Sequence, residues 1–249
     1  MTTRTPIRRA ILLGGSSDIG VATLEHICTA DATIALLGRR GPHRRTAAHQ
    51  LRTTGRTVFE VDYDAAMTYG ETKNALLVAQ ELVSPGNAEP IDAIIMAIGD
   101  LGDPDTPDQT LVHNFTGPAL LMLAAGELLD TQHGGNLIIL SSAAAVRPRT
   151  SILTYSISKQ AIDSLARTMA PELAQHGVRT LLVRPGHVIT KMTVGLPRPP
   201  LTSTASQVAE RIRKSLDGPR RVIWVPHSMK WVLLGLRLVP RPLIPKSLR

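Results

Sequence analysis

The sequence "ILTYSISKQA" holds a tyrosine and a lysine four residues apart, Tyr155 and Lys159. On a helix, this spacing places both side chains on one face. A phenol can give a proton to a carbonyl oxygen, but its unperturbed pKa of about 10 is high for neutral pH. A nearby ammonium favours the phenolate and lowers that pKa. The pair therefore predicts proton transfer at an oxygen atom, against the alternative of two ordinary residues on a helix face.

A glycine-rich turn, "LLGGSSDIGVA", follows the first predicted strand and opens the first predicted helix. Glycines allow a tight turn, and the helix N-terminus offers free N–H groups and a partial positive charge to a pyrophosphate. Asp18 stands where a middle glycine is usual, and it either faces the phosphate or caps the helix. The alternative is a connection that binds no ligand. The predicted dinucleotide-binding residues of the turn are Gly14, Ser16, Ser17, Asp18, Ile19 and Gly20.

The second predicted strand ends in "LLGRR". An acidic residue at this point often binds the adenosine ribose of NAD. Arg39 and Arg40 stand here instead, and a guanidinium is suited to a 2′-phosphate. A solvated basic turn is the alternative. We therefore expect NADP(H) as the cofactor, with NAD(H) as the second choice.

Apolar, β-branched runs alternate with helical stretches along the chain. Seven runs are predicted as strands: "RRAILLGG", "TIALLG", "TVFEVD", "IDAIIMAIG", "NLIILSS", "VRTLLVRPG" and "RRVIWVP". This alternation is typical of a parallel sheet with helices on both faces and right-handed crossovers. We expect an α/β fold, a single doubly wound Rossmann-type domain over residues 1–249 with about seven parallel strands. The first helix is predicted to cover "SDIGVATLEHICTA", with Cys28 in the core.

Composition narrows the function classes. Cys28 is the only cysteine, so no internal disulfide is possible, which fits a reducing compartment such as the cytoplasm. The net charge is +8, yet aromatic residues are only 3 % and no zinc-finger or RNA-binding motif appears. We therefore expect neither nucleic-acid binding nor a metal site. No apolar run is long enough for a membrane-spanning helix, and the basic, apolar N-terminus is predicted as a strand and not a signal peptide.

Two segments near the end of the chain are predicted to have their own roles. The loop "GLPRPPLTSTA" follows the sixth strand, and residues 190–215 are a candidate substrate lid. Residues 226–249 are basic and apolar, and no acidic residue follows Asp217. This tail either packs on the domain or a second subunit, or lies as an interfacial helix on an anionic membrane.

Taken together, these motifs resemble the short-chain dehydrogenase/reductase family over essentially the full length of the chain. The resemblance is carried by the glycine turn, "VDYD", "MAIG", "HNFTG", "LSS" with "TYSISK", and "RPGHVIT". It implies a catalytic set of Ser142, Tyr155, Lys159 and Asn114. It also implies cofactor contacts from Asp62, Tyr63, Gly99, Pro185, Gly186, Val188 and Thr190, beside those from Arg39, Tyr155 and Lys159.

The resemblance also assigns roles. Ser142 would hold the substrate oxygen, and its thirteen-residue offset from Tyr155 selects it over Ser141. Lys159 would also bind the nicotinamide ribose, and Asn114 would anchor a water that leads from Lys159 to solvent. Val188 and Thr190 would orient the nicotinamide amide, and the family commonly forms dimers and tetramers.

A narrower resemblance is to the decaprenylphosphoryl-2-keto-erythro-pentose reductases, carried by "LLGGSSDIG", "AIGDLGD", "SSAAAVRPR", "VRPGHVITKMT" and the tail. Those enzymes reduce a polyprenyl-phosphate-linked keto-sugar, made by a separate flavoprotein oxidase, on the way to cell-wall arabinan. The stretches "TSIL" before Tyr155 and "GRR" after the second strand differ from that group. The resemblance implies reduction of a ketone to a secondary alcohol, with peripheral contact at the inner face of the plasma membrane.

Alternatives remain at the level of function and of single residues. The alternative functions are reduction of an unrelated ketone and a non-catalytic role as a dinucleotide-binding scaffold. Arg147 and Arg149 are candidates for a substrate phosphate, with a solvated loop as the alternative. His187 is expected to pack or to form hydrogen bonds, and general-base catalysis is the alternative hypothesis.

Overall fold

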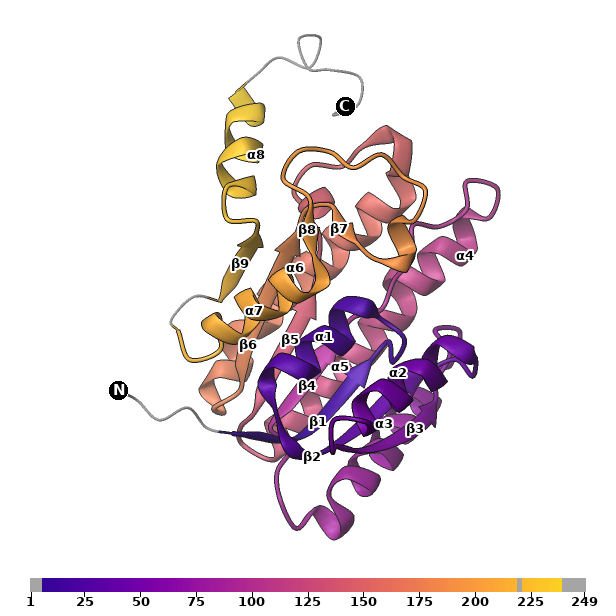
Figure 1. Cartoon of the computed structure of the whole chain (residues 1–249), viewed down its shortest axis with the longest axis vertical. Coiled ribbons are helices and arrows are strands. Elements are labelled where there is room, and N and C mark those ends of the chain that lie inside the picture. The colour runs from indigo at the N-terminus through magenta and orange to yellow at the C-terminus, as the bar shows by residue number, and fades with distance from the viewer. Residues whose placement is uncertain (1–5, 219–220, 239–249) are drawn as a thin grey trace.

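The computed structural model describes residues 6–218 and 221–238. Seven of the described strands form one parallel sheet in the order β3-β2-β1-β4-β5-β6-β9 (Figure 1). Their bounds are β1 Ile7–Leu13, β2 Cys28–Gly38, β3 Thr57–Asp62, β4 Ala93–Met96, β5 Asn136–Leu140, β6 Arg179–Pro185 and β9 Val222–Val225. All seven predicted strands and the doubly wound α/β fold are confirmed.

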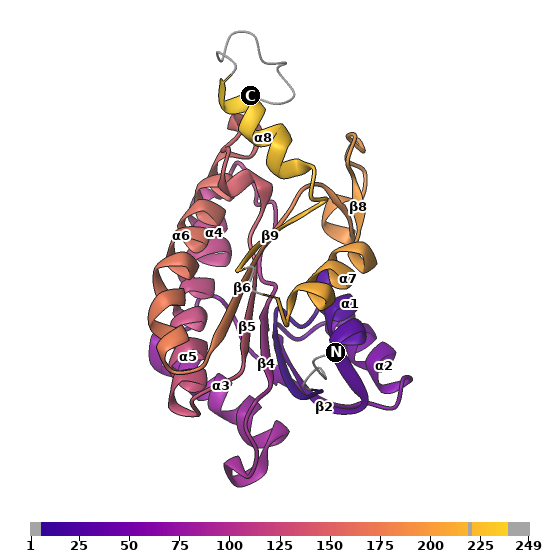
Figure 2. The ribbon, with the colours of Figure 1, turned by 90° about the vertical axis from the view of Figure 1, so that its left-hand side faces the viewer.

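Helices cover both faces of the sheet (Figure 2). One face carries α1 Asp18–Ile27, α2 Pro42–Arg52 and α7 Ala205–Ser215. The other carries α3 Tyr69–Val83, α4 Pro107–Leu111, α5 Gly117–Thr131 and α6 Leu153–Gln175. The short helical turns are η1 Pro85–Asn87, η2 Val112–Thr116, η3 Ala143–Ala145, η4 Thr150–Ile152 and η5 Lys191–Thr193.

The central strands are apolar on both sides because both faces of the sheet are covered. Leu12 of β1 packs with Leu24 of α1 and Ile212 of α7 in one core cluster. The neighbouring Ile11 belongs to the opposite cluster, with Leu121 of α5. This alternation is the period of two that a β-strand imposes on its side chains.

The first helix is shorter than the sequence predicts. The sequence pattern predicts a helix through Ala30, but α1 ends at Ile27 and Cys28 already has extended backbone angles. Cys28 lies opposite Ile7 in the ladder between β1 and β2, and its carbonyl accepts a hydrogen bond from Arg56. Pairing with β1 therefore outweighs the local helical pattern. Cys28 is buried as predicted, and burial raises the pKa of its thiol to about 12.

The segment after β6 has two parts. A short pair of strands, β7 Val188–Ile189 and β8 Ser203–Thr204, closes a loop over residues 190–202. The following α7 begins at the capping residue Thr204 and packs against α1 through buried Val208 and Ile212. The part of the predicted lid that precedes α7 is residues 190–204, called the lid below.

Beyond β9, the helix α8 Met229–Leu238 projects past the sheet (Figure 2). Its Trp231, Val232 and Leu234 side chains are exposed. Residues 239–249 of the predicted tail lie outside the described residues. None of the described helices has the length and apolar character required to cross a membrane.

The sheet order places the predicted site. β1, β4, β5 and β6 are neighbours, and all point in one direction. The sheet extends from β1 to β2 on one side and to β4 on the other, so the crossovers diverge at this point. A crevice at the carboxyl ends of such strands is where open α/β sheets bind their ligands. The segments after these four strands carry the candidate residues.

Candidate active site

Tyr155 and Lys159 lie on one face of α6, as their spacing predicts. The Lys159 ammonium is 5.9 Å from the centroid of the Tyr155 ring. Lys159 is only 6 % exposed, and its Nζ donates hydrogen bonds to the carbonyls of Ile98, at 2.9 Å, and Leu140, at 3.4 Å. These carbonyls follow β4 and end β5, so the sheet itself holds the lysine beside the tyrosine.

Ser142 is the serine that accompanies Tyr155. It follows β5, its Oγ accepts a hydrogen bond from the backbone N–H of Ala144 at 3.1 Å, and its side chain is hydrogen-bonded to Tyr155. The competing Ser141 is buried and donates to a carboxylate oxygen of Asp163 at 2.9 Å. The structure therefore places Ser142, and not Ser141, beside the phenol.

Asn114 lies in the π-helical turn η2, between α4 and α5. Such turns widen a helix locally and often occur at functional sites. Asn114 is fully buried, and its Oδ1 accepts a hydrogen bond from the backbone N–H of Asp100 at 2.9 Å. A Cβ added at Gly99 would lie 2.7 Å from Asn114 Oδ1 and 2.9 Å from Lys159 Nζ, so these two groups leave no room for a side chain at this position.

Burial dominates the electrostatics of the pair. It raises the pKa of the Tyr155 phenol, although the hydrogen bond to Ser142 and the charge of Arg149 act to lower it. Burial lowers the pKa of Lys159 to about 8, and the negative charge of Asp100 opposes that shift. The predicted lowering of the Tyr155 pKa by Lys159 is therefore not what the structure has. Desolvation outweighs it, and the ammonium is directed at backbone carbonyls.

A buried ion pair lies behind the site. The Asp163 carboxylate is 3 % exposed and accepts two hydrogen bonds from Arg184 of β6, at 2.7 and 2.8 Å. It also accepts from Arg167 and Ser141, and the Arg184 guanidinium lies 5.0 Å from the Trp224 ring centroid. Burial raises the pKa of Asp163, but these partners leave it below its ordinary value. The network fixes α6 on the sheet, and no local sequence pattern indicates it.

The glycine turn fits a dinucleotide. Gly14 has a φ of +93°, and an added Cβ would lie 2.7 Å from the carbonyl of Ala97. At Gly15 an added Cβ would lie 2.8 Å from Leu36, and at Gly20 it would lie 2.6 Å from Leu12. The backbone is thus drawn against β2 and β4, leaving the start of α1 open at the carboxyl edge. This is the cradle that a pyrophosphate requires.

Ser17, and not Asp18, caps α1. The Ser17 Oγ accepts a hydrogen bond from the backbone N–H of Gly20 at 3.2 Å. Asp18 is the first helical residue, and its carboxylate pairs with Lys191 of the lid at 3.0 Å. Lys191 had no predicted role.

The arginines that follow β2 differ in whether they have a protein partner. Arg39 is exposed and makes no hydrogen bond or ion pair with any described residue. Arg40 pairs with Asp62 at 2.5 Å, and the buried Arg44 pairs with the same carboxylate at 2.9 Å. These contacts, Arg44 first, hold the pKa of Asp62 below its usual value. Arg44 also donates to the carbonyl of Gly38, so it fixes the turn and leaves Arg39 free for a ligand.

The remaining predicted cofactor residues follow the carboxyl ends of the strands or begin α1. They are Ile19, Tyr63, Gly99, Pro185, Gly186, Val188 and Thr190. Gly186 is held to β9 by a backbone hydrogen bond to Val225, and Val188 is buried in β7. The strand order thus brings the predicted cofactor residues to one edge of the sheet.

Two cations lie near His187, which precedes β7. The positive charges of Arg149 and of Arg198 in the lid add to burial in lowering the pKa of His187. His187 Nδ1 lies 3.3 Å from the Thr202 hydroxyl, whereas its buried Nε2 has no hydrogen-bond partner among the described residues. Arg147 follows on the same loop as Arg149. His187 therefore forms hydrogen bonds, as expected, and Arg198 is a lid residue that sequence reasoning missed.

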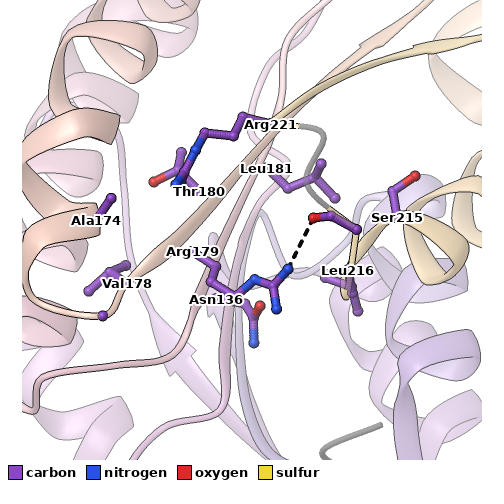
Figure 3. Close-up of a pocket in the computed structure, with 11 residues that line it drawn as sticks. Asn136, Ala174, Val178, Arg179, Thr180, Leu181, Ser215, Leu216 and Arg221 are labelled. Atoms are coloured by element: carbon purple, nitrogen blue, oxygen red, sulfur yellow. Dashed lines mark hydrogen bonds between the residues drawn. The ribbon is translucent and has the colours of Figure 1, made fainter. Parts of the chain in front are cut away.

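A hollow of about 250 Å³ lies elsewhere, at the amino ends of β5 and β6 (Figure 3). Arg179, Arg221 and Thr180 line it, together with residues of α7. None of the predicted site residues lines this hollow, so it is separate from the chemistry described above.

The arrangement can protonate an oxygen. The raised pKa keeps Tyr155 as a neutral phenol at neutral pH, the form that gives a proton away. Because Ser142 Oγ accepts from Ala144, its hydroxyl proton is directed elsewhere, to the phenol or to a substrate oxygen. Lys159 supplies a positive charge beside the phenolate that forms.

Comparisons with known proteins agree with the fold described above. The family model described as short chain dehydrogenase matches residues 8–199. An uncharacterized oxidoreductase of Mycobacterium tuberculosis is 30 % identical over 241 residues, covering 93 % of both chains. One of Streptomyces coelicolor is 33 % identical over 248 residues, covering 96 % of this chain and 95 % of the relative.

Solved structures share the fold at low identity. A short-chain type dehydrogenase/reductase from Mycobacterium ulcerans has a TM-score of 0.75 at 20 % identity, covering 95 % of this chain and 97 % of its own. A short chain dehydrogenase from Burkholderia cenocepacia, solved in complex with NADP, has a TM-score of 0.73 at 20 % identity, covering 97 % of this chain and 100 % of its own.

Proposed function

Because the chain belongs to the short-chain dehydrogenase family and is an oxidoreductase acting on CH–OH or C=O groups, we propose that it reduces a ketone with NADPH. The observation that carries this proposal is Tyr155, hydrogen-bonded to Ser142 and backed by the Lys159 ammonium. The product is a secondary alcohol.

In this proposal the chain's own residues handle the proton. A bound reduced nicotinamide supplies the hydride. Tyr155 gives its proton to the carbonyl oxygen, and the Ser142 hydroxyl donates a hydrogen bond to the same oxygen. Lys159 stabilises the resulting phenolate, since two of its three N–H donors are held by Ile98 and Leu140 and the third is free. Asn114 holds the Asp100 backbone, and its proposed water connects Lys159 to solvent.

The cofactor is proposed to be NADPH. Arg39 is the described cation at the end of β2 that has no protein partner, whereas Arg40 shares Asp62 with Arg44. A free guanidinium beside the adenosine ribose favours a 2′-phosphate. NADH remains the second choice.

The substrate is proposed to be anionic and lipid-linked, with a polyprenyl-phosphate-linked 2-keto-pentose as the specific candidate. Arg149 and Arg198 have no carboxylate partner among the described residues, and His187 Nε2 is also unpaired. Together with Arg147, these groups suit a phosphate next to the ketone. Exposed apolar side chains of the lid and α8 suit a prenyl chain: Met192, Val194, Leu196, Leu201, Trp231 and Leu234.

The same features support two proposed interactions. Lys230 beside the exposed Trp231 makes α8 suited to peripheral contact with an anionic membrane. Phe115, Leu123 and Ile157 are exposed apolar residues of η2, α5 and α6, and they suit contact with a second copy of the chain. A 2-keto-pentose must be supplied by an oxidation, for which a flavoprotein oxidase is the proposed partner, and its arabinose product belongs to cell-wall precursor synthesis.

The test is NADPH consumption by the full-length protein with the extracted lipid-linked keto-pentose, compared with simple neutral ketones and with NADH. We expect turnover with the lipid-linked substrate and NADPH. Turnover with neutral ketones alone would make the chain a reductase of an unrelated ketone. Absence of turnover with every carbonyl, despite dinucleotide binding, would favour a non-catalytic scaffold.

A further inference from the structure

Lys191 joins the lid to the glycine turn. Its backbone N–H donates a hydrogen bond to Asp18 Oδ2 at 2.7 Å, and its ammonium lies 3.0 Å from Asp18 Oδ1. The same ammonium donates to the carbonyl of Ser16. Two of these contacts join residues 173 positions apart in sequence, and the third joins residues 175 positions apart. The mechanism above uses neither Lys191 nor its pairing with Asp18.

The position of this pair is unusual for a dinucleotide site. Asp18 is in the first turn of α1, where the free N–H groups face a pyrophosphate. A carboxylate here is favourable for the helix but repels the negative charges of a pyrophosphate. Lys191 brings a compensating positive charge to the place where a glycine is usual.

The ammonium also has capacity left for a ligand. An ammonium carries three N–H donors, and Asp18 and Ser16 occupy two of them. The Lys191 and Asp18 side chains are 41 % and 33 % exposed, so the pair lies at the surface and not in the protein interior, where a ligand can reach it.

We propose that Lys191 is a pyrophosphate ligand, carried by the lid and positioned by Asp18. This rests on the dinucleotide site of the proposed function. A bound pyrophosphate accepts the third N–H of Lys191, and the start of the lid is then fixed over the cofactor. By thermodynamic linkage, a substrate that binds to the lid then raises the affinity for the dinucleotide, and the dinucleotide raises the affinity for that substrate by the same factor.

The experiment measures binding without catalysis. Two ligands displace NADPH, followed by its fluorescence, from the full-length protein. One is 2′-phospho-ADP-ribose, which has the pyrophosphate, and the other is adenosine 2′-monophosphate, which lacks it. The variants are Lys191→Met, Lys191→Arg, and Lys191→Met combined with Asp18→Asn. Lys73→Met, which removes a surface ion pair with Glu127 on another face, is the matched control.

We expect Lys191→Met to lower the affinity for 2′-phospho-ADP-ribose by about tenfold or more, and the affinity for adenosine 2′-monophosphate by less than about twofold. Lys191→Arg should retain most of the affinity, and Lys73→Met all of it. The combined variant should stay at least about fivefold weaker than the wild type for 2′-phospho-ADP-ribose, because the lost phosphate contact is not restored.

Three results would overturn the inference. They are unchanged affinity in Lys191→Met, equal losses for both ligands, and recovery of wild-type affinity in the combined variant. The last would mean that Lys191 only neutralises Asp18. A wild type that binds neither NADPH nor 2′-phospho-ADP-ribose is a different result, since it would overturn the dinucleotide site itself and this inference with it.

Discussion

Lys159→Met removes a buried ammonium, and its effect on stability should depend on pH in a defined way. Burial lowers the pKa of Lys159 from 10.5 to about 8. Below pH 8 the lysine is protonated in both the folded and the unfolded chain. Above pH 8 the folded chain releases the proton while the unfolded chain keeps it up to about 10.5. The unfolded state then binds more protons, so the free energy of unfolding of the wild type rises with pH.

Each pH unit in this window contributes about 1.4 kcal/mol. From pH 8 to about pH 9.5, the wild type should therefore gain about 2 kcal/mol relative to Lys159→Met, which has no proton to release. Urea unfolding of both proteins at neutral pH, pH 8 and about pH 9.5 measures this difference, and titrations common to both chains cancel. The exposed Lys73→Met should show no such trend. A difference that stays constant across this range would refute the claim that Lys159 is desolvated in the folded chain.

Three further predictions concern single residues. Arg39→Asp should lower the preference for NADPH over NADH by about a hundredfold in kcat/KM, whereas the same charge change in Arg8→Asp, at the amino end of β1 on the opposite edge of the sheet, should not; an unchanged ratio contradicts the assignment of Arg39. Gly99→Ala should lower kcat by about a hundredfold, since its Cβ would lie 2.9 Å from Lys159 Nζ; Gly86→Ala, also at positive φ but in open space, should leave kcat unchanged, and equal effects would count against the steric argument. Asp163→Asn should lower the free energy of unfolding in urea by about 3 kcal/mol, because Arg184 loses its buried partner, while Glu210→Gln at an exposed surface pair should change it far less; similar small losses in both variants would show that the network contributes little.

The fold was predictable because its signals are local. Runs such as "AIIM" in β4 and "NLIIL" in β5 are buried on both faces, and the helices between them leave few alternatives to a parallel sheet. The end of α1 was not predictable, because the extended conformation of Cys28 depends on pairing with Ile7, twenty-one residues earlier. A local sequence pattern carries no information about such a long-range contact.

The candidate site divides in the same way. Tyr155, Lys159, Ser142 and Gly99 were accessible from spacing and resemblance, and strand order then brings their elements together. The groups that hold these residues in place were not accessible from the sequence. Asp163 meets Arg184 across the interface of α6 with β6, and Asp18 meets Lys191 across 173 residues. The direction of the Tyr155 pKa shift also required the structure, because desolvation is set by tertiary burial.

The most direct test of the account is the rate of ketone reduction by Tyr155→Phe in the presence of NADPH, measured with NADPH binding on the same protein. Phenylalanine keeps the ring and removes only the proton donor. We predict that NADPH binding stays within about twofold, while kcat falls by about a thousandfold. Wild-type kcat in Tyr155→Phe would contradict the central claim that this phenol protonates the substrate oxygen.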